Sequence, residues 1–227
     1  MNYFYLKLCV LICFIIAVSY YNTYYSSIKE PFNSKNDKIV LLGDSILKNN
    51  SYVSDGKGID DLLEERTNEK IYSYAENNSK IIDIYSQISK IPIDLNNNST
   101  IIFLSAGGND ILSFYVDQKE DATNMSFLNP MFSAYKKLIK SIQARMNDSR
   151  IVLLDIYYPE NITYKQFHPI ISNWNKKIYE YASDPANKIS NVLKISNNLT
   201  QKNDFTMGME PSSVGGEKIV NMILETY

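Results

Sequence analysis

Short apolar runs alternate with helical patterns from residue 38 to residue 227, and this alternation constrains the fold more than any other feature. The β-rich apolar runs fall at residues 39–42, 70–75, 100–105, 150–156 and 192–195. Apolar residues that repeat at three and four predict helices at 59–66, 80–91, 130–146, 169–181 and 216–227. Such alternation favours a parallel sheet with right-handed crossovers and helices on both faces. We therefore predict a single α/β domain at residues 38–227, with a five-stranded parallel sheet.

The composition excludes several classes of function. A chain of 227 residues with 44% apolar content suits one folded domain, and a net charge of -2 offers no basic surface for nucleic acid. Both cysteines, Cys9 and Cys13, precede the predicted domain, which therefore has no thiol for a disulfide or a thiolate metal site. The chain also lacks a glycine-rich phosphate loop of the P-loop or dinucleotide type. We expect no metal, nucleotide or redox cofactor.

Residues 1–28 predict a membrane-targeting segment. Lys7 is its only charge, and residues 8–18 are wholly apolar. Ala17-Val18-Ser19 places small residues where a signal peptide would be cleaved, whereas the flanking tyrosines suit a longer, uncleaved signal anchor. Both alternatives put the folded domain outside the cytosol, either anchored on the lumenal or extracellular side or secreted. Residues 29–37 are polar and predict a linker.

Three polar motifs follow predicted strands, at what would be one edge of the sheet. They are Gly43-Asp44-Ser45, Gly107-Gly108-Asn109-Asp110 and the segment that runs from Asp204 to Glu210-Pro211-Ser212. The carboxyl ends of parallel strands meet at one edge, where ligands bind. Most of the eight glycines lie in or beside these motifs, which indicates tight turns around a site.

The residue types in these motifs suit acyl transfer by a serine nucleophile. A serine hydroxyl needs a general base, a group that orients this base, and donors for the developing oxyanion. Ser45 is the candidate nucleophile, and its backbone N–H and the side chain of Asn109 are candidate oxyanion donors. Asp204 is a candidate for orienting the base, and Asp44 for bracing the turn that carries Ser45.

With these motifs, the chain from about residue 38 onward resembles the SGNH (GDSL-type) hydrolase family. The resemblance implies a flavodoxin-like, three-layer α/β/α fold and an esterase, lipase or carbohydrate deacetylase activity. Ser45 matches the nucleophile of the family, and Asn109, preceded by Gly108, matches its oxyanion asparagine. The second block of the family has a glycine that donates to the oxyanion, and Asn78 is the nearest match here. Asparagine tolerates the left-handed region, so we expect the turn to be kept.

The last block departs from the Asp-x-x-His-Pro pattern of the family. Here Glu210-Pro211-Ser212 follows Asp204 after an insertion, so a glutamate stands where a histidine is expected. The sequence thereby resembles a subgroup of SGNH-like proteins with Glu-Pro-Ser at this place. Glu210 is a candidate base if burial and a nearby Asp204 raise its pKa. The alternative is that Glu210 caps or salt-bridges the start of the last helix.

The only histidine, His168, follows the fourth predicted strand and is the other candidate base. A catalytic triad is defined by geometry and not by sequence position, so a relocated histidine is one hypothesis. The alternative is a loop histidine that precedes the proline at the start of a helix. For Trp174 and Asn175 in that helix we predict packing and polar support.

Two functions from different classes follow. The first is a serine ester hydrolase that acts outside the cytosol on a small-molecule or glycan ester, without a cofactor. The second is a non-catalytic binding module for an acylated or glycan ligand, motivated by the missing histidine. A membrane-tethered scaffold is a third hypothesis, which rests only on the 18 tyrosines. Sequons at Asn124, Asn161 and Asn198 would make the domain a glycoprotein in a eukaryotic lumen.

Overall fold

The computed structural model of the protein describes residues 38–117 and 124–226. The predicted membrane segment and linker, at residues 1–37, lie outside the described residues. Among the helices of the described part, none combines the length and the hydropathy needed to cross a membrane.

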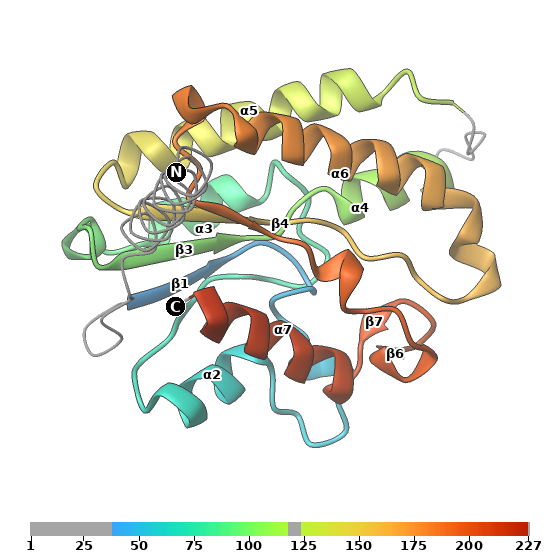
Figure 1. The fold of residues 1–227 in the computed structure, drawn as a ribbon, viewed down its shortest axis with the longest axis horizontal. Helices are drawn as coiled ribbons and strands as arrows, with labels where there is room; N and C mark the ends of the chain where they lie inside the picture. Colours follow the sequence, from blue (N-terminus) through green and yellow to red (C-terminus); the bar gives the residue numbers. More distant parts are fainter. Residues whose placement is uncertain (1–37, 118–123, 227) are drawn as a thin grey trace, which may run out of the picture. The chain divides into compact units, whose positions relative to one another are not determined.

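A five-stranded parallel sheet forms the centre of the domain (Figure 1). The strands are β1 (Lys38–Leu42), β2 (Tyr72–Ser73), β3 (Thr100–Leu104), β4 (Arg150–Leu154) and β5 (Asn191–Leu193). They pair in the order β2-β1-β3-β4-β5, and every pairing is parallel. The predicted five-stranded parallel sheet is confirmed. The strands β2 to β5 are shorter than predicted, whereas β1 is one residue longer.

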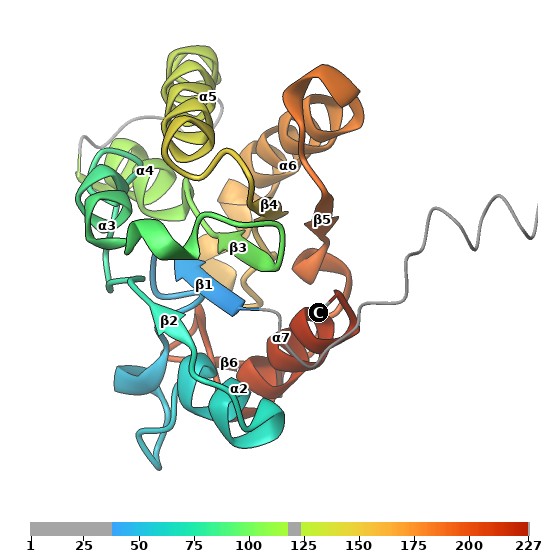
Figure 2. The same ribbon diagram turned by 90° about the vertical axis from the view of Figure 1, so that its left-hand side faces the viewer.

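Helices cover both faces of this sheet, as Figure 2 shows end-on. They are α2 (Ile59–Thr67), α3 (Ile84–Lys90), α4 (Gly108–Leu112), α5 (Leu128–Arg145), α6 (His168–Ser183) and α7 (Ser213–Thr226). The helices α3, α4, α5 and α6 lie on one side of the sheet, and α2 and α7 lie on the other (Figures 1 and 2). This arrangement confirms the three-layer α/β/α fold. All five predicted helices form, and α4 is an addition that the sequence patterns did not predict.

Shorter helical segments occur in the connections. The 3₁₀ helices are Asn50–Tyr52, Ile93–Leu95, Ile162–Phe167, Pro185–Asn187, Ile195–Asn197 and Lys202–Asp204, and Ser113–Asp117 is a π-helical turn.

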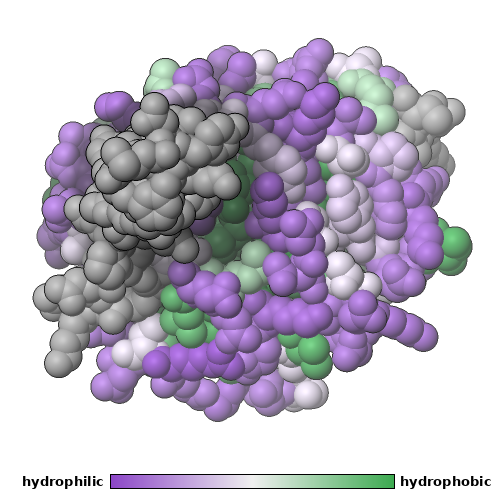
Figure 3. Space-filling model, in the orientation of Figure 1, coloured by the Kyte–Doolittle hydropathy of each residue, from purple (hydrophilic) through white to green (hydrophobic). Residues whose placement is uncertain are grey.

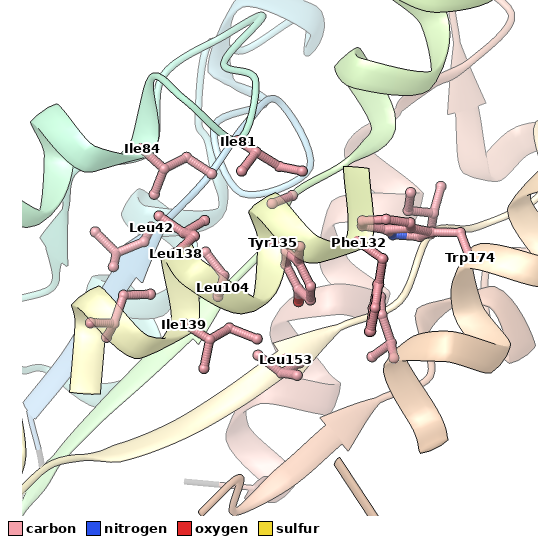
Figure 4. Packing of buried hydrophobic residues seen from close by; sticks show 14 of the residues in the cluster. Leu42, Ile81, Ile84, Leu104, Phe132, Tyr135, Leu138, Ile139, Leu153 and Trp174 are labelled. Atoms are coloured by element: carbon pink, nitrogen blue, oxygen red, sulfur yellow. The ribbon is translucent and has the colours of Figure 1, made fainter. Parts of the chain in front are cut away.

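The two faces of the sheet bury two separate hydrophobic clusters. Successive side chains of a strand point to opposite faces. Val40 and Leu42 therefore pack under α3, α5 and α6, and Ile39 and Leu41 pack against α2 and α7. Figure 4 shows Leu138 of α5 above the first of these faces, close to Leu42. Burial of a leucine or isoleucine side chain contributes about 1.5–3 kcal/mol, so both clusters stabilise the sheet that carries the polar loops.

A small antiparallel hairpin precedes the last helix. Its strands are β6 (Phe205–Thr206) and β7 (Glu210–Pro211). Met207 and Gly208 have positive φ angles of 49° and 84° in the turn between them. The residues inserted between Asp204 and Glu210 thus form this hairpin. The surface around it is mostly hydrophilic, with scattered apolar side chains, on the face drawn in Figure 3.

Candidate active site

The three polar motifs meet at one pocket beyond the carboxyl ends of the strands. The pocket has about 530 Å³ of empty volume, part of which is open to solvent. Its polar wall contains Asp44, Ser45, Gly108, Asn109 and Glu210. The remaining wall is apolar and is made by Ile46, Ile111, Leu112, Ile156, Tyr157, Pro159, Tyr164, Phe167, Ile171 and Met209. Residues from both ends of the domain are therefore brought to one place.

Gly43 and Asp44 set the conformation of the turn that presents Ser45. Gly43 has a φ of 136°, and a Cβ there would lie 2.1 Å from the carbonyl oxygen of Ser105, so only glycine fits. The Ser105 hydroxyl accepts from the Asp44 backbone N–H at 3.1 Å and donates to Asp44 Oδ1 at 2.8 Å. Asp44 Oδ1 also accepts from the N–H of Ile46 at 3.1 Å. Asp44 braces the turn, as predicted.

The carboxyl of Asp44 is held at an unusual pKa. Burial raises its pKa from 3.8 to about 6, although the hydrogen bonds from Ser105 and Ile46 act in the opposite direction. The charge of Asp110 raises the pKa further. A carboxyl with a raised pKa therefore lies in the polar wall of the pocket, next to Ser45.

The two candidate oxyanion donors are the Ser45 N–H and the Asn109 side chain. Ser45 lies at the start of a turn in which the N–H groups of Leu47 and Lys48 both donate to the Asp44 carbonyl. The Asn109 side chain extends from the first turn of α4 into the pocket, and its Nδ2 donates one hydrogen to the Ser79 carbonyl at 3.0 Å. An amide nitrogen has two hydrogens, so the second hydrogen of Nδ2 is left for a ligand.

Gly108 and Asn78, which were also predicted near the oxyanion, differ in whether they line the pocket. Gly108 begins α4 and lines the pocket. Asn78 has a φ of 62°, which confirms that it takes the left-handed conformation of its turn. Its exposed side chain does not line the pocket. The structure thus keeps the left-handed turn at Asn78, but Asn78 is not among the residues that line the pocket with Ser45.

Glu210 reaches the pocket from β7. Burial raises its pKa, the Ser45 hydroxyl lies close enough to lower it, and the charge of Asp44 raises it again, so the net direction is upward. One carboxylate oxygen, Oε2, is buried without a hydrogen-bond partner among the described residues. Glu210 therefore offers a partly desolvated, free acceptor beside the candidate nucleophile. The like charge that acts on it is that of Asp44, in place of the Asp204 that the sequence predicted.

Asp204 has other partners. Its Oδ2 accepts from Lys218 Nζ at 2.8 Å and from the backbone N–H groups of Thr200 and Gln201, each at 2.9 Å. Burial acts to raise its pKa, but these three donors outweigh burial, and the pKa of Asp204 is lowered. Asp204 does not line the pocket. It fastens the start of the hairpin to α7.

The glycines after Glu210 explain why α7 lies so close to this segment. Ser212 caps the helix, since its Oγ accepts from the N–H of Gly215 at 3.2 Å. A Cβ on Gly215 would lie 2.2 Å from the Asp204 carbonyl oxygen, and a Cβ on Gly216 would lie 2.8 Å from Asn49 Nδ2. The motif from Glu210 to Gly216 thus joins the hairpin to the helix by close backbone contact.

The structure does not place His168 among the residues that line the pocket. Its Nε2 lies 2.9 Å from the carbonyl oxygen of Pro159, and its ring packs edge-on against Tyr158. Trp174 is fully buried, and Asn175 bonds to both the N–H and the carbonyl of Ile156. These contacts confirm packing and polar support for the last two residues.

Two residues near the site had no sequence signal strong enough to select them. Tyr157 lines the pocket, and burial together with the charges of Glu210 and Asp44 raises its pKa, so its hydroxyl keeps its proton. Gln87 is buried in α3 and bonds to Gly43. Tyr157 directly follows a predicted strand, which is a weak indication, whereas Gln87 lies within an ordinary helical pattern. No group of three His, Cys, Asp or Glu side chains gathers among the described residues as it would around a metal ion.

Comparison with known proteins identifies the family and the fold. Residues 39–208, more than half of the chain, match the model of the GDSL-like lipase/acylhydrolase family. A G-D-S-L family protein from Veillonella parvula has a similar structure, with 17% identity over 85% of this chain and 98% of that one, and a TM-score of 0.63. Phospholipase A1 from Streptomyces albidoflavus shares 13% identity over 84% and 99% of the two chains, with a TM-score of 0.64.

An acetyl xylan esterase is similar to the same degree, with 15% identity over 83% of this chain and 98% of that one, and a TM-score of 0.62. At these identities the structural matches establish the fold. No curated protein matches the chain. The family match covers Ser45 and Asn109 and ends shortly before Glu210. The chain therefore belongs to the GDSL-like lipase/acylhydrolase family, a family of serine ester hydrolases.

Proposed function

We propose that this domain hydrolyses esters of apolar acyl groups, with Ser45 as the nucleophile and Glu210 in place of the usual histidine base. The observation that supports this proposal is the shared pocket. Ser45, Asn109 and Glu210 line it together, and the Ser45 hydroxyl acts on the pKa of Glu210. An upward shift favours a base, because general bases work best when their pKa lies near the working pH.

In this mechanism Ser45 Oγ attacks the carbonyl carbon of the ester, and its proton moves to the Glu210 carboxylate. The Ser45 N–H and Asn109 Nδ2 donate to the oxyanion of the tetrahedral intermediate. The intermediate collapses, the bond to the alcohol oxygen breaks, and Glu210 returns the proton to the alcohol. Water then attacks the acyl-enzyme, with Glu210 again taking the proton. The acid is released when Ser45 recovers its hydrogen.

The apolar wall of the pocket indicates which side of the ester it receives. Ile111, Leu112, Ile156, Phe167 and Ile171 lie beside the polar wall. An alkyl chain gains about 0.8 kcal/mol for each CH₂ group that it buries. We therefore place the acyl group against these side chains and the alcohol toward the open mouth. On the alcohol side we propose a small molecule or a glycan.

The test uses the full-length chain in a mild detergent, with acetyl, butyryl and octanoyl p-nitrophenyl esters and a fluorophosphonate label read by intact mass. Ser45→Ala is compared with Ser51→Ala, a substitution of an exposed serine nearby. We expect labelling and turnover to be lost in Ser45→Ala and kept in Ser51→Ala, with the longer acyl groups preferred. Faster turnover of the acetyl ester would contradict the acyl assignment. Absence of labelling in a folded protein would favour a binding module.

The same proposal places the domain outside the cytosol, either anchored or secreted. This rests on the apolar residues 8–18 and the polar linker that follows. Protease added to intact cells that produce the full-length chain should remove an anchored domain, or the domain should be found in the medium. A domain protected until the cells are lysed would contradict this location.

A further inference from the structure

One side-chain amide lies behind the nucleophile turn and bonds to it in three places. Gln87 of α3 is fully buried. Its Oε1 accepts from the Gly43 N–H at 2.8 Å, and its Nε2 donates to the Gly43 carbonyl at 2.8 Å and to Ser79 Oγ at 3.1 Å. Both hydrogens of Nε2 are used. The orientation of the amide is fixed, because the Gly43 N–H needs an acceptor opposite it.

The backbone explains why an amide is required there. Strand β2, which pairs with β1, ends at Ser73. Beyond it, the N–H groups of Tyr74 and Glu76 donate to the carbonyls of Leu41 and Gly43. The N–H of Gly43 would be left buried without an acceptor, which is costly. The Gly43 N–H therefore needs an acceptor, whereas the Gly43 carbonyl already accepts from Glu76 and takes Gln87 Nε2 as a second donor. A glutamine side chain meets this need.

The third bond extends the network to the oxyanion asparagine. The Ser79 side chain is held by Gln87, and the Ser79 carbonyl accepts from Asn109 Nδ2 at 3.0 Å. A continuous path of hydrogen bonds therefore runs from Gly43 through Gln87 and Ser79 to Asn109. The two proposed oxyanion donors, the Ser45 N–H and the Asn109 side chain, belong to the two ends of this path.

We infer that Gln87 is a positioning residue, which holds the nucleophile turn and the Asn109 amide in register so that both donate to one oxyanion. This inference rests on the proposed function. Gln87 does not line the pocket, so it acts through Gly43 and Ser79 and not on the substrate. A displacement of about 1 Å in a catalytic group is enough to lower a rate about a hundredfold.

The chain offers a matched comparison. Asn175 of α6 bonds to the N–H of Ile156 at 2.9 Å and to its carbonyl at 2.7 Å, and it is 2% exposed. It holds a backbone unit in the same way as Gln87, but at the apolar wall of the pocket and with no bond to an oxyanion donor. Its removal should disturb substrate binding and stability, without the specific loss of oxyanion stabilisation.

The experiment measures kcat, KM and the inhibition constant of an alkyl trifluoromethyl ketone, whose adduct with serine carries an oxyanion. The full-length variants are Gln87→Met, which keeps the volume and loses all three bonds, Ser79→Ala, which loses one, and Asn175→Ala. We expect Gln87→Met to lower kcat about tenfold to a hundredfold with KM nearly unchanged. The inhibition constant of the ketone should rise by a similar factor. Ser79→Ala should show a smaller change of the same kind.

A loss of kcat in Gln87→Met that Asn175→Ala reproduces would overturn the inference, and so would an unchanged kcat and ketone affinity. Hydrogen exchange gives a second readout that needs no turnover. In Gln87→Met, faster exchange should be confined to residues 42–47 and 76–82. If the wild type hydrolyses the ester no faster than Ser45→Ala, the proposed function fails. The positioning role of Gln87 is then tested by hydrogen exchange alone. Unchanged exchange, or faster exchange throughout the domain, would then overturn the positioning role.

Discussion

Lys218 Nζ donates to the Asp204 carboxylate at 2.8 Å, so the aspartate of the last motif is neutralised by a cation of α7. The side chain of Asp204 is fully buried, whereas that of Lys218 is 34% exposed. This pair ties the segment before Glu210 to the final helix. Glu210 is left without an aspartate that orients it, and its charged neighbour in the pocket is Asp44.

Lys218→Met should lower the stability of the domain by about 2–3 kcal/mol at pH 7, because a buried carboxylate loses its cation. The native pKa of Asp204 is lowered, so its stabilising effect is present above its unfolded pKa, near 3.8, and disappears as the pH falls through the native value. Urea unfolding at pH 7 and at pH 3 measures the difference. The control is Lys202→Met, at an exposed lysine in the same segment. An equal loss of stability at both pH values would show that the ion pair does not stabilise the domain. A large loss of kcat in a variant that remains stable would indicate a catalytic role for Asp204.

Glu210→Gln should abolish most of the activity. Glutamine keeps the shape of the side chain but accepts no proton, and loss of a general base typically costs about 10²–10⁴ in kcat. Burial of the neutral amide is easier than burial of the charge, so the melting temperature should not fall. The measurement is kcat with a butyryl ester, and Glu217→Gln on the exposed face of α7 is the control. Turnover that survives in Glu210→Gln would remove the carboxylate from the base role.

The pH dependence of kcat/KM tests the same assignment. Glu210 acts as a base only when ionised, so the rate should rise with pH through its raised pKa and then level off. In Asp44→Asn the like charge is absent, and the rising limb should move to lower pH. His168→Ala should leave the limb in place, because its Nε2 is engaged by Pro159. A limb that vanishes with His168→Ala would instead identify the histidine as the base.

The fold could be predicted from the sequence because its signals are local and repeated. The apolar run of β1 and the spacing of Leu138, Ile139 and Ile142 in α5 each indicate their element directly, and the structure confirms both. The observed ends of the strands differ from the predicted ones where loop residues make the hydrogen bonds. At β2 the predicted six-residue strand is reduced to two residues. Helix α4 escaped prediction because five residues are too few to show a helical period.

The site was less predictable, because it depends on contacts between distant segments. Ser45 and Asn109 were found from motifs, and the structure brings both to one pocket. The partner of Asp204 was not foreseen, since nothing in the spacing of Asp204 and Lys218 distinguishes an ion pair from a helix face. Gln87 carries no motif at all. Its inferred role arises only because β2 ends early and leaves the Gly43 N–H without a backbone acceptor.

Gly215→Ala should destabilise the domain by about 1–3 kcal/mol, the usual range for overpacking. The new Cβ would lie 2.2 Å from the Asp204 carbonyl oxygen, so α7 has to move away from the segment that leads to Glu210. Because that segment carries Glu210, the proposed base, kcat should fall as well. Thermal unfolding and turnover are measured beside Val214→Ala, at the partly exposed neighbour. Unchanged stability would mean that the helix moves freely at this point.

Asp44→Asn should stabilise the domain at neutral pH and leave its stability at pH 3 nearly unchanged. Burial raises the pKa of Asp44 from 3.8 to about 6. A raised acidic pKa means that ionisation opposes folding, so the cost is absent below about pH 4, grows between pH 4 and pH 6, and is complete above. At 1.36 kcal/mol for each pKa unit, the full cost is about 3 kcal/mol. Asparagine keeps an oxygen that can accept from Ser105 or Ile46 and removes the charge.

Urea unfolding of wild type and Asp44→Asn from pH 3 to pH 8 measures this difference, with Asp55→Asn, at an exposed turn, as the control. A variant that is less stable than the wild type at pH 8 would show that the two hydrogen bonds to Oδ1 outweigh the cost of the buried charge. The expected outcome would mean that the fold tolerates a destabilising carboxylate at the nucleophile turn. The charge of Asp44 also raises the pKa of Glu210, the base in the proposed mechanism.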